Sequence, residues 1–414
     1  MHSSMKRENW IAVLTGGRDP HYAFGLSTAL VANGAGIDLI GGDGHDFPEF
    51  HGHARVRFLN LRGDQRAASF VRKVCRVSAY YGRLIRYAAK AQPRIFHILW
   101  NNKIQTVDRI LLTLYYKWLG KKIVLTAHNV NAGVRDANDS SLNRLTLRLQ
   151  YRLADHIFVH TEKMKKELMD LAGLAADRIT VIPYGINNAV PNTSLTAEEA
   201  KQRLGIRKGE KVLLFYGHIA PYKGLDYLAA AFRQVGARHE RYRLIIAGAP
   251  KNCQEYWEPI RQGLREDVES GRVLLQAGFI SDQETEVYFK AADVCVLPYR
   301  HIFQSGVLFL AHSFGVPVLA ADVGSLREDI VEGQNGFIFR PEDPDDLANA
   351  IERYFESDVY ADLNNRRQQI RDYATERHSW DIVGRMTMDV YGGLLRVPSP
   401  KGPMNRDIAT TPSM

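Results

Sequence analysis

The chain has 414 residues, which is too long for one ordinary hydrophobic core, and its 45% apolar content is that of a globular protein. Its three cysteines, Cys75, Cys253 and Cys295, lack the spacing of a zinc site or a disulfide framework and indicate a reducing compartment. The net charge of +8 fits an acidic partner such as a nucleotide, a phosphorylated substrate or an anionic membrane, without choosing among them.

Short apolar runs alternate with longer amphipathic segments along the whole chain, which favours parallel sheets covered by helices on both faces. The same pattern restarts at Val212. The expected strands of the first half are 10–17, 36–42, 54–61, 94–100, 122–129, 156–161 and 179–186. Those of the second half are 211–218, 242–250, 272–280, 292–299, 316–322 and 335–341.

Two doubly wound α/β domains are therefore predicted, and the polar stretch 187–195 is the expected linker. We place the first domain at 1–190 and the second at 191–378. A last helix over 379–395 is expected to cross back to the first domain, and the Pro- and Ser-rich residues 396–414 to be disordered. Ligands of such sheets bind at the carboxyl ends of the strands, so the chemistry is expected in a cleft between the domains.

The first residues contain no apolar signal-peptide core, and no run reaches the roughly 18 apolar residues of a membrane span. The most apolar helical stretch, DRILLTLYYKWLG at 108–120, is too short to span a membrane and is predicted to be a core helix. A cytoplasmic protein is expected, either free or on the inner face of the membrane.

A lysine follows the first strand of the second half, in FYGHIAPYKGLDYL at 215–228. Lys223 comes after a glycine turn and just before a helix, where free amides and the helix dipole favour an anion. The stretch therefore indicates a phosphate site; a solvated lysine in a turn is the alternative.

A second candidate anion site lies in LPYRHIFQSGVLFLAHSFGVPVLAADVGSLREDI at 297–330. Gln304, Ser305 and Gly306 open an apolar helix, so backbone amides at that helix start are expected to be available to an anion. An ordinary helix cap by Ser305 is the alternative.

Residues 212–340 together resemble the C-terminal domain of GT-B glycosyltransferases, specifically the GT4 group. YGHIAPYKGLDYLAAAF is similar to that family's GR-x-x-P-x-KG stretch, and IIAGAP, LLQAGFISDQETEVYFKAADVCVLPY, GVPVLAADVGSLREDI and NGFIFRPEDPDDLANAI follow in the family's order. LTGG, LTAHNV and HTEKMKKEL…ITVIPYGI carry a weaker resemblance in the first half. The resemblance implies two Rossmann-like domains facing a central cleft and a retaining transferase that uses a nucleotide-diphospho-sugar.

The resemblance also assigns roles to matching positions. Lys223 would hold the donor diphosphate, His218 replaces the family's arginine, and His128 matches a histidine that lines the sugar and acceptor site, which makes His128 and Lys223 the expected catalytic residues. The expected donor-binding set comprises Gly16, Gly17, Gly217, His218, Lys223, Gly248, Phe279, Ile280, Gln304, Ser305, Gly306 and Val307. In this set Gly16 and Gly17 form the first-domain glycine loop, and the turn at 279–280 frames the nucleobase.

One departure from the family pattern concerns two glutamates that many members carry eight positions apart. Counted without gaps from Pro298, these positions are Ile302 and Leu310, whose side chains accept no hydrogen bond. Gln304, Ser305 and Gly306 are candidates to replace the missing contacts. The departure also keeps open a catalytically weak GT-B protein that binds a nucleotide sugar or scaffolds a partner.

No cofactor and no metal are expected. Negative charge builds on the leaving diphosphate during transfer, and Lys223, His218 and the amides at 305–307 would stabilise it. The only clear DxD sequence, at 343–345, lies at a predicted helix start and is interpreted as a cap.

Residues 66–90 contain seven cations and no acid. At 100° per residue, one face carries Arg72, Arg76, Arg83, Arg86 and Lys90, and the opposite face carries Phe70, Val74, Val77, Tyr81, Leu84 and Ala88. This helix is predicted to dock on an anionic membrane or a lipid-diphosphate acceptor; a solvated basic face is the alternative.

The leading prediction is a transferase that moves a sugar onto a glycan or lipid-linked acceptor in surface polysaccharide or glycolipid biosynthesis. A nucleotide-sugar epimerase or a phosphorylase is the rival among enzymes, although no site for pyridoxal phosphate is found. Nucleic-acid binding is not expected, because no aromatic-basic platform or groove-reading motif is present.

Overall fold

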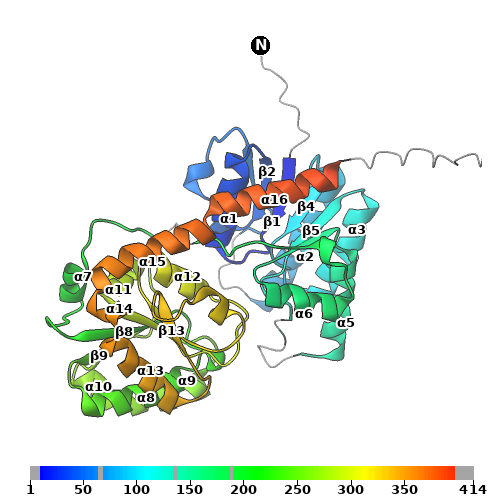
Figure 1. Cartoon of the computed structure of the whole chain (residues 1–414). Coiled ribbons are helices and arrows are strands. Elements are labelled where there is room, and N and C mark those ends of the chain that lie inside the picture. Colours follow the sequence, from blue (N-terminus) through cyan, green and yellow to red (C-terminus); the bar gives the residue numbers. More distant parts are fainter. Residues whose placement is uncertain (1–9, 64–68, 132, 134–138, 187–189, 397–414) are drawn as a thin grey trace, which may run out of the picture.

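Two parallel sheets organise the chain, as the computed structural model shows for residues 10–63, 69–131, 133, 139–186 and 190–396 (Figure 1). The first sheet has seven strands in the order β3-β2-β1-β4-β5-β6-β7, and the second has six in the order β10-β9-β8-β11-β12-β13. The strands are β1 (Trp10–Leu14), β2 (Gly36–Gly41), β3 (Val56–Asn60), β4 (Ile95–Ile98), β5 (Lys122–Thr126), β6 (His156–Val159), β7 (Ile179–Val181), β8 (Lys211–Tyr216), β9 (Tyr242–Ala247), β10 (Val273–Gln276), β11 (Val294–Leu297), β12 (Val318–Ala321) and β13 (Gly336–Phe339).

The predicted fold class of two doubly wound α/β domains is confirmed, and each expected apolar run contains one strand. Parts of three predicted segments lie outside the described residues: the start of the basic segment at 66–68, the linker at 187–189 and the tail at 397–414.

Helices cover both faces of each sheet, so that strands such as β2, β4 and β11 are buried at every residue. Continuous apolar runs satisfy this two-sided burial, whereas alternating sequences would not. The helices are α1 (Pro20–Ala32), α2 (Phe70–Lys90), the π-helical η4 (Val107–Leu112), α3 (Thr113–Trp118), α5 (Ser141–Leu153), α6 (Glu162–Ala172), α7 (Ala197–Arg203), α8 (Leu225–Arg238), α9 (Gln254–Gly263), α10 (Arg265–Glu269), α11 (Asp282–Ala291), α12 (Gly306–Ser313), α13 (Pro344–Glu356), α14 (Asp358–Ala361), α15 (Leu363–His378) and α16 (Trp380–Leu395).

In each sheet the strand order reverses beside a central strand, between β1 and β4 and between β8 and β11. At such a reversal the loops after the two strands leave in opposite directions and open a crevice. The structure therefore has two candidate crevices, one in each domain.

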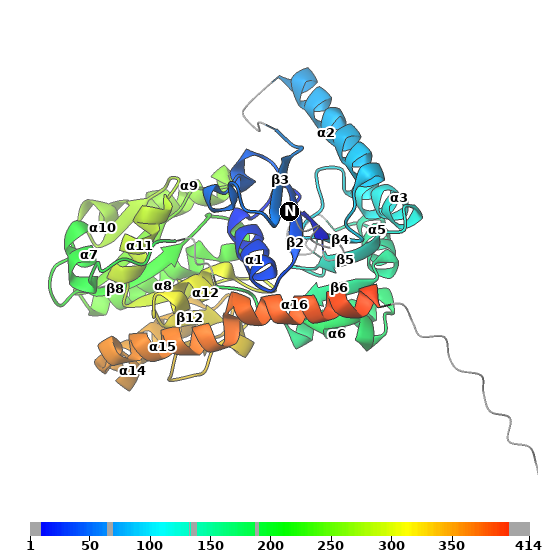
Figure 2. The same cartoon turned by 90° about the horizontal axis from the view of Figure 1, so that it is seen from above.

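Helix α16 leaves the second domain and packs along α1 of the first (Figure 2). Trp380 donates from its indole nitrogen to the Ile186 carbonyl (2.7 Å), and the Tyr391 hydroxyl lies 2.6 Å from Nδ1 of the buried His97. Trp380, Val383 and Tyr391 belong to the apolar core between α1 and the first sheet. The last helix thus completes the core of the first domain.

The prediction that 108–120 is a core helix is wrong for one of its faces. Leu112 and Tyr116 are buried, but Leu111, Leu114 and Trp118 are exposed, Trp118 by 78%. The segment begins as the π-helical turn η4 and continues as α3. None of the described helices is both long and apolar enough to span a bilayer.

Helix α2 departs from its expected packing as well. Tyr81, Leu84 and Ala88 are buried as the amphipathic pattern predicts, but Phe70, Val71 and Val74 are exposed. Figure 2 shows the reason: the N-terminal part of α2 extends beyond the body of the first domain.

Replacing Gly25 with alanine should loosen the crossover, because a Cβ there would overlap the Trp380 indole. We expect a loss of roughly 1–3 kcal/mol in the free energy of unfolding, which is typical of overpacking.

Gly82→Ala is the matched control, since no atom lies within 4 Å of its added Cβ in α2. It should stabilise the protein by about 0.5–1 kcal/mol. Urea unfolding of both variants measures the difference; equal midpoints would contradict the packing role of Gly25.

Candidate functional site

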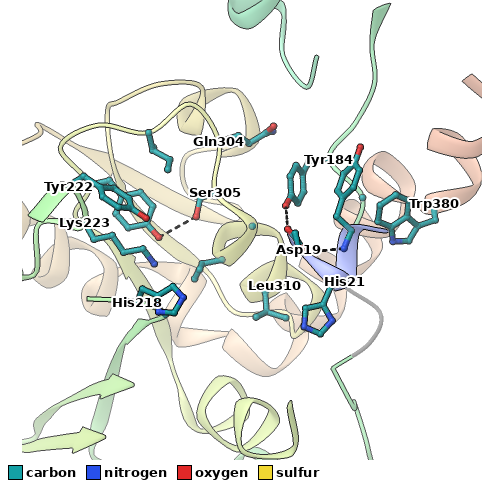
Figure 3. Close-up of a pocket in the computed structure, with 17 residues that line it drawn as sticks. Asp19, His21, Tyr184, His218, Tyr222, Lys223, Gln304, Ser305, Leu310 and Trp380 are labelled. Atoms are coloured by element: carbon teal, nitrogen blue, oxygen red, sulfur yellow. Dashed lines mark hydrogen bonds between the residues drawn. The ribbon is translucent and has the colours of Figure 1, made fainter. Parts of the chain in front are cut away.

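A cavity of about 490 Å³ lies between the two domains, at the carboxyl ends of β1, β8 and β11 (Figure 3). It is lined by Asp19, His21, Tyr22, Tyr184, Gly185, Gly217, His218, Tyr222, Lys223, Tyr299, Ile302, Gln304, Ser305, Gly306, Val307, Leu310 and Trp380. Seven members of the predicted donor-binding set are among them: Gly217, His218, Lys223, Gln304, Ser305, Gly306 and Val307. We call it the interdomain cavity.

Lys223 is a buried cation of the interdomain cavity, and only 7% of its surface is exposed. Its Nζ lies 3.4 Å from the Tyr216 carbonyl and 5.5 Å from the centre of the Tyr299 ring. No carboxylate of the described residues forms an ion pair with it. Burial, the main cause, lowers the pKa of Lys223 from 10.5 to about 8. The ammonium group therefore stays mostly charged near neutral pH and lacks a counter-ion.

The start of α12 faces the same cavity. Ser305 occupies the N-cap position, but its hydroxyl makes no capping hydrogen bond to the helix and lies 3.3 Å from the Tyr299 hydroxyl instead. The alternative of an ordinary cap by Ser305 is therefore wrong. The Ser305 side chain therefore does not occupy the amides of Gly306 and Val307. These amides lie at the positive end of the helix dipole and are available to bind an anion.

His218 lies beside Lys223 in Figure 3. Burial, together with the charges of Lys251 and Lys223, lowers the pKa of His218 below 6.5. The imidazole is therefore neutral near pH 7 and offers a hydrogen bond rather than a second charge. Lys251, in the loop after β9, is a cation that the sequence analysis missed.

Glycines give Lys223 its position. The Lys223 Nζ lies 2.8 Å from where a Cβ on Gly217 would be, so any side chain there would displace it. Gly224, with φ +65°, packs on the Pro298 carbonyl at the end of β11. Gly248 does not line the cavity; it packs on the Gly217 carbonyl and so supports the wall from behind.

The positions of the two absent glutamates, Ile302 and Leu310, do line the interdomain cavity. Gln304 lines the same cavity; its Nε2 donates to Asp329 (3.2 Å), and its Oε1 is covered and has no hydrogen-bond partner. Burial raises the pKa of Asp329 to about 7. This wall thus carries the amide of Gln304 and the apolar side chains of Ile302 and Leu310.

The first domain supplies the opposite wall, whose residues were not among the predicted site residues. Asp19 is the single carboxylate among the cavity's described lining residues; one oxygen accepts from the Tyr22 amide (3.1 Å) and the other from the Tyr184 hydroxyl (3.4 Å). Its φ of 35° is unusual for a residue other than glycine and marks a position held by its surroundings.

Gly16 and Gly17 do not line the interdomain cavity. Both have positive φ, and a Cβ on them would overlap the Trp100 carbonyl and the Arg62 side chain respectively. The tight turn that they form directs Asp19 into the interdomain cavity and Arg18 into a separate one. Gly16 and Gly17 therefore contribute to the two cavities through the shape of this turn.

His128 lies in that separate cavity, which measures about 280 Å³ and opens at the carboxyl ends of β1, β4 and β5. We call it the first-domain cavity. The structure therefore does not bring the two predicted catalytic residues, His128 and Lys223, into one pocket. The Tyr22 ring joins the two spaces: it lines the interdomain cavity and contacts the His128 ring edge-on at 4.5 Å.

The protonation of His128 follows from its neighbours. His160 Nδ1 lies 3.2 Å from the Ile182 carbonyl, which only accepts, so this nitrogen carries the proton. His160 Nε2 then accepts from His128 Nδ1 (3.0 Å), which leaves a lone pair on His128 Nε2. Burial lowers the pKa of both rings, so both are neutral.

Phe279 and Ile280, the predicted nucleobase turn, lie outside the interdomain cavity. Phe279 is 86% exposed, and Ile280 packs partly against the core of the second domain. Among the described residues there is no group of three or more His, Cys, Asp or Glu side chains that could hold a metal ion. Asp343 of the DxD sequence caps α13 by accepting from the Asp346 amide (2.9 Å).

Two facing doubly wound domains, with a buried cation and the start of a helix in the cavity between them, define the class as a two-domain α/β protein with a cleft at the carboxyl ends of its strands. The family model for glycosyl transferases group 1 matches residues 196–377, and that for glycosyltransferase family 4 matches 21–190. The chain belongs to the GT4-type glycosyltransferases of the GT-B fold.

Relatives of similar sequence agree with this membership. An uncharacterized glycosyltransferase of Methanocaldococcus jannaschii is 29% identical over 56% of this chain and 58% of its own length. A D-inositol 3-phosphate glycosyltransferase of Acidothermus cellulolyticus is 30% identical over 51% and 48%. The chain thus spans about half the length of these relatives.

Two solved structures show the same fold. Sucrose-phosphate synthase of Thermosynechococcus elongatus superposes with a TM-score of 0.74 at 20% identity, over 93% of this chain and 99% of that one. Anabaena HepE, solved with UDP-glucose, superposes with a TM-score of 0.71 at 18% identity, over 93% and 99%.

The affinity for a nucleoside diphosphate should fall as the pH rises above about 8, because Lys223 loses its proton there in the free protein while the bound diphosphate requires the charged form. The dissociation constant should rise about fivefold over the first pH unit above this pKa, and approach a tenfold rise per unit beyond it. Isothermal titration between pH 7 and 9.5 measures it.

Lys223→Met is the control for this titration. Its weaker binding should stay constant over the same pH range, because no proton is exchanged at this position. A wild-type affinity that does not change between pH 7 and 9.5 would contradict the assigned role of Lys223.

Proposed function

We propose that this chain transfers a sugar from a nucleotide-diphospho-sugar to a glycan or lipid-linked acceptor, with retention of the anomeric configuration. The observation that carries the proposal is the buried charge of Lys223, which has no carboxylate partner among the described residues and lies with the start of α12 in one cavity. A diphosphate would supply the anionic partner that Lys223 lacks among the described residues.

In the proposed reaction, Lys223 and the amides of Gly306 and Val307 stabilise the charge that grows on the leaving diphosphate. His218 adds a hydrogen bond as a neutral imidazole. These groups supply positive potential without a metal ion, so we propose metal-independent transfer. We propose that no covalent intermediate forms; the leaving diphosphate itself would accept the acceptor's proton during attack from the same face.

Asp19 faces this site from the first domain. Its carboxylate is suited to accept hydrogen bonds from sugar hydroxyls and to stabilise positive charge on the sugar ring in the transition state. It therefore provides, from the opposite wall, the kind of contact that Ile302 and Leu310 do not make.

The apolar side chains of Ile302 and Leu310 also support a second candidate, a catalytically weak GT-B protein that binds a nucleotide sugar or acts as a scaffold. Both side chains line the interdomain cavity, so they withhold two hydrogen bonds from any ligand held there. Binding without turnover would distinguish this candidate.

A panel of UDP-, GDP- and ADP-sugars should identify the donor. One nucleotide should raise the melting temperature of the wild type, and Lys223→Ala should weaken its binding by at least about tenfold, the value of a lost charged hydrogen bond. Transfer is then assayed with lipid-linked and glycan acceptors, and the product's anomeric configuration is read by NMR.

Lys166→Ala, an exposed lysine on α6, is the control for charge loss. If the wild type binds a nucleotide sugar, and Lys223→Ala weakens this binding, but no sugar is transferred to any acceptor, the scaffold candidate is favoured. Stabilisation by no donor would contradict the proposed activity.

We further propose that the protein works on the surface of an anionic membrane, in surface polysaccharide or glycolipid biosynthesis. The extended part of α2 presents Phe70, Val71 and Val74 to solvent, Phe70 by 80%, beside the exposed cations Arg72 and Lys73. Apolar and basic side chains on one protruding helix suit the interface of an anionic bilayer.

Neighbouring elements extend this surface. The Tyr115 hydroxyl of α3 donates to the Ile85 carbonyl of α2, so the exposed Trp118 and Leu114 lie on a helix that packs beside it. Helix α2 carries no acidic residue that would oppose anionic lipid.

Replacing Arg76, Arg83 and Arg86 with glutamate should abolish sedimentation with phosphatidylglycerol vesicles, because about 1 kcal/mol per cation is lost and repulsion is added. The matched control replaces Arg203, Arg207 and Lys208 of the second domain, which changes the net charge equally. Equal sedimentation of both variants would contradict docking through α2.

A further inference from the structure

We infer that the first-domain cavity binds the acceptor through an anionic group, a phosphate or a carboxylate, held by Arg109 and Arg18. The inference rests on the proposed transfer function and names the class of its acceptor: a hydroxylated anion such as a phosphorylated sugar or polyol, either free or as a lipid headgroup.

Arg109 is the charge at the base of this cavity, and it is 7% exposed. Its Nη1 donates to the side chains of Asn143 (2.8 Å) and Thr146 (2.9 Å), whereas its Nε is covered and has no hydrogen-bond partner. Burying a guanidinium with an N–H group that makes no hydrogen bond lowers the stability of the fold, unless a bound ligand accepts that hydrogen bond.

The neighbouring acid does not neutralise Arg109. Asp108 accepts from the Tyr81 hydroxyl (3.0 Å) and the Asn102 amide (2.9 Å) and forms no ion pair with the guanidinium. Burial, the largest cause, lowers the pKa of Arg109, and the charge of Asp108 only partly offsets this. The positive charge is therefore only partly compensated.

Arg18 brings a second guanidinium to the same cavity, from the turn after β1. No side-chain partner of Arg18 is found in the described part of the chain. The described lining residues of this cavity include no aspartate or glutamate. Two cations without an acid select an anion over a neutral sugar.

Two buried acceptor atoms define the rest of the ligand. Asn129 Oδ1 and His128 Nε2 are covered and have no hydrogen-bond partner, and the His128 lone pair accepts but does not donate. Both residues line the first-domain cavity. A ligand that satisfies them must carry hydroxyl donors as well as its anionic group. The Trp100 ring, stacked on His128 at 4.2 Å, adds an apolar wall for a sugar or polyol.

The position of the cavity fits an acceptor. It meets the interdomain cavity at the contact between His128 and Tyr22, and Arg18 is adjacent in sequence to Asp19 of the interdomain cavity. A hydroxyl bound near His128 therefore lies on the side from which the donor sugar is approached.

Isothermal titration of the full chain tests the inference with glucose 6-phosphate, glucose and dihexanoyl phosphatidic acid below its micelle concentration. The wild type should bind a phosphate monoester and not glucose. Arg109→Gln should weaken phosphate binding about tenfold or more, as should Arg18→Gln, which removes an exposed side chain and preserves folding. Preference between the two monoesters identifies a soluble or a lipid source.

Lys166→Gln controls for charge, and Lys223→Ala separates the two sites. Lys223→Ala should lose nucleotide binding and keep glucose 6-phosphate binding, whereas Arg109→Gln should show the reverse. Unchanged monoester affinity in both Arg109→Gln and Arg18→Gln would overturn the inference, as would equal binding of glucose and the monoesters to the wild type. Failure of the proposed function would be seen separately. In that case nucleotide binding would be absent, or Lys223→Ala would not weaken it.

Discussion

The second-domain wall of the interdomain cavity is organised around a buried ammonium group that forms no ion pair with a carboxylate of the described residues. Removing Lys223 from water lowers the stability of the domain, and the Tyr216 carbonyl and the Tyr299 ring offset only part of this. The surrounding loops are nevertheless organised to keep it there: Gly217 leaves room for the amine, Gly248 supports Gly217, and Gly224 fits against the end of β11. Strain and desolvation of this kind are retained where a ligand uses them.

The sequence predicted the sheets well because each strand is buried on both faces and therefore reads as a continuous apolar run. It also predicted the second-domain wall of the interdomain cavity, since Gly217, Lys223 and Gln304–Val307 are close in sequence to the ends of β8 and β11. Local patterns sufficed there because each loop is positioned by the strand that precedes it.

The opposite wall was beyond prediction because it is assembled from distant segments. Asp19, Tyr184 and Trp380 come from the ends of three different elements and meet only when α16 returns to the first domain. Amphipathic periodicity describes the helix face of α2 correctly, but it does not reveal that the N-terminal turns extend past the sheet that they would cover. Likewise, the family resemblance predicted that His128 and Lys223 are both catalytic residues, whereas in the structure they lie in two adjacent cavities.

The return of α16 has a consequence for synthesis on the ribosome. When β7 has emerged, the first domain has all seven of its strands, but the groove along α1 that Trp380 and Tyr391 fill is still open. The second domain, in contrast, has its complete sheet by β13 and can close its core before α16 is made. We therefore expect the domain encoded first to finish folding last. Until α16 arrives, the newly made chain would expose an apolar groove, and a chaperone that shields this groove would raise the yield of folded protein.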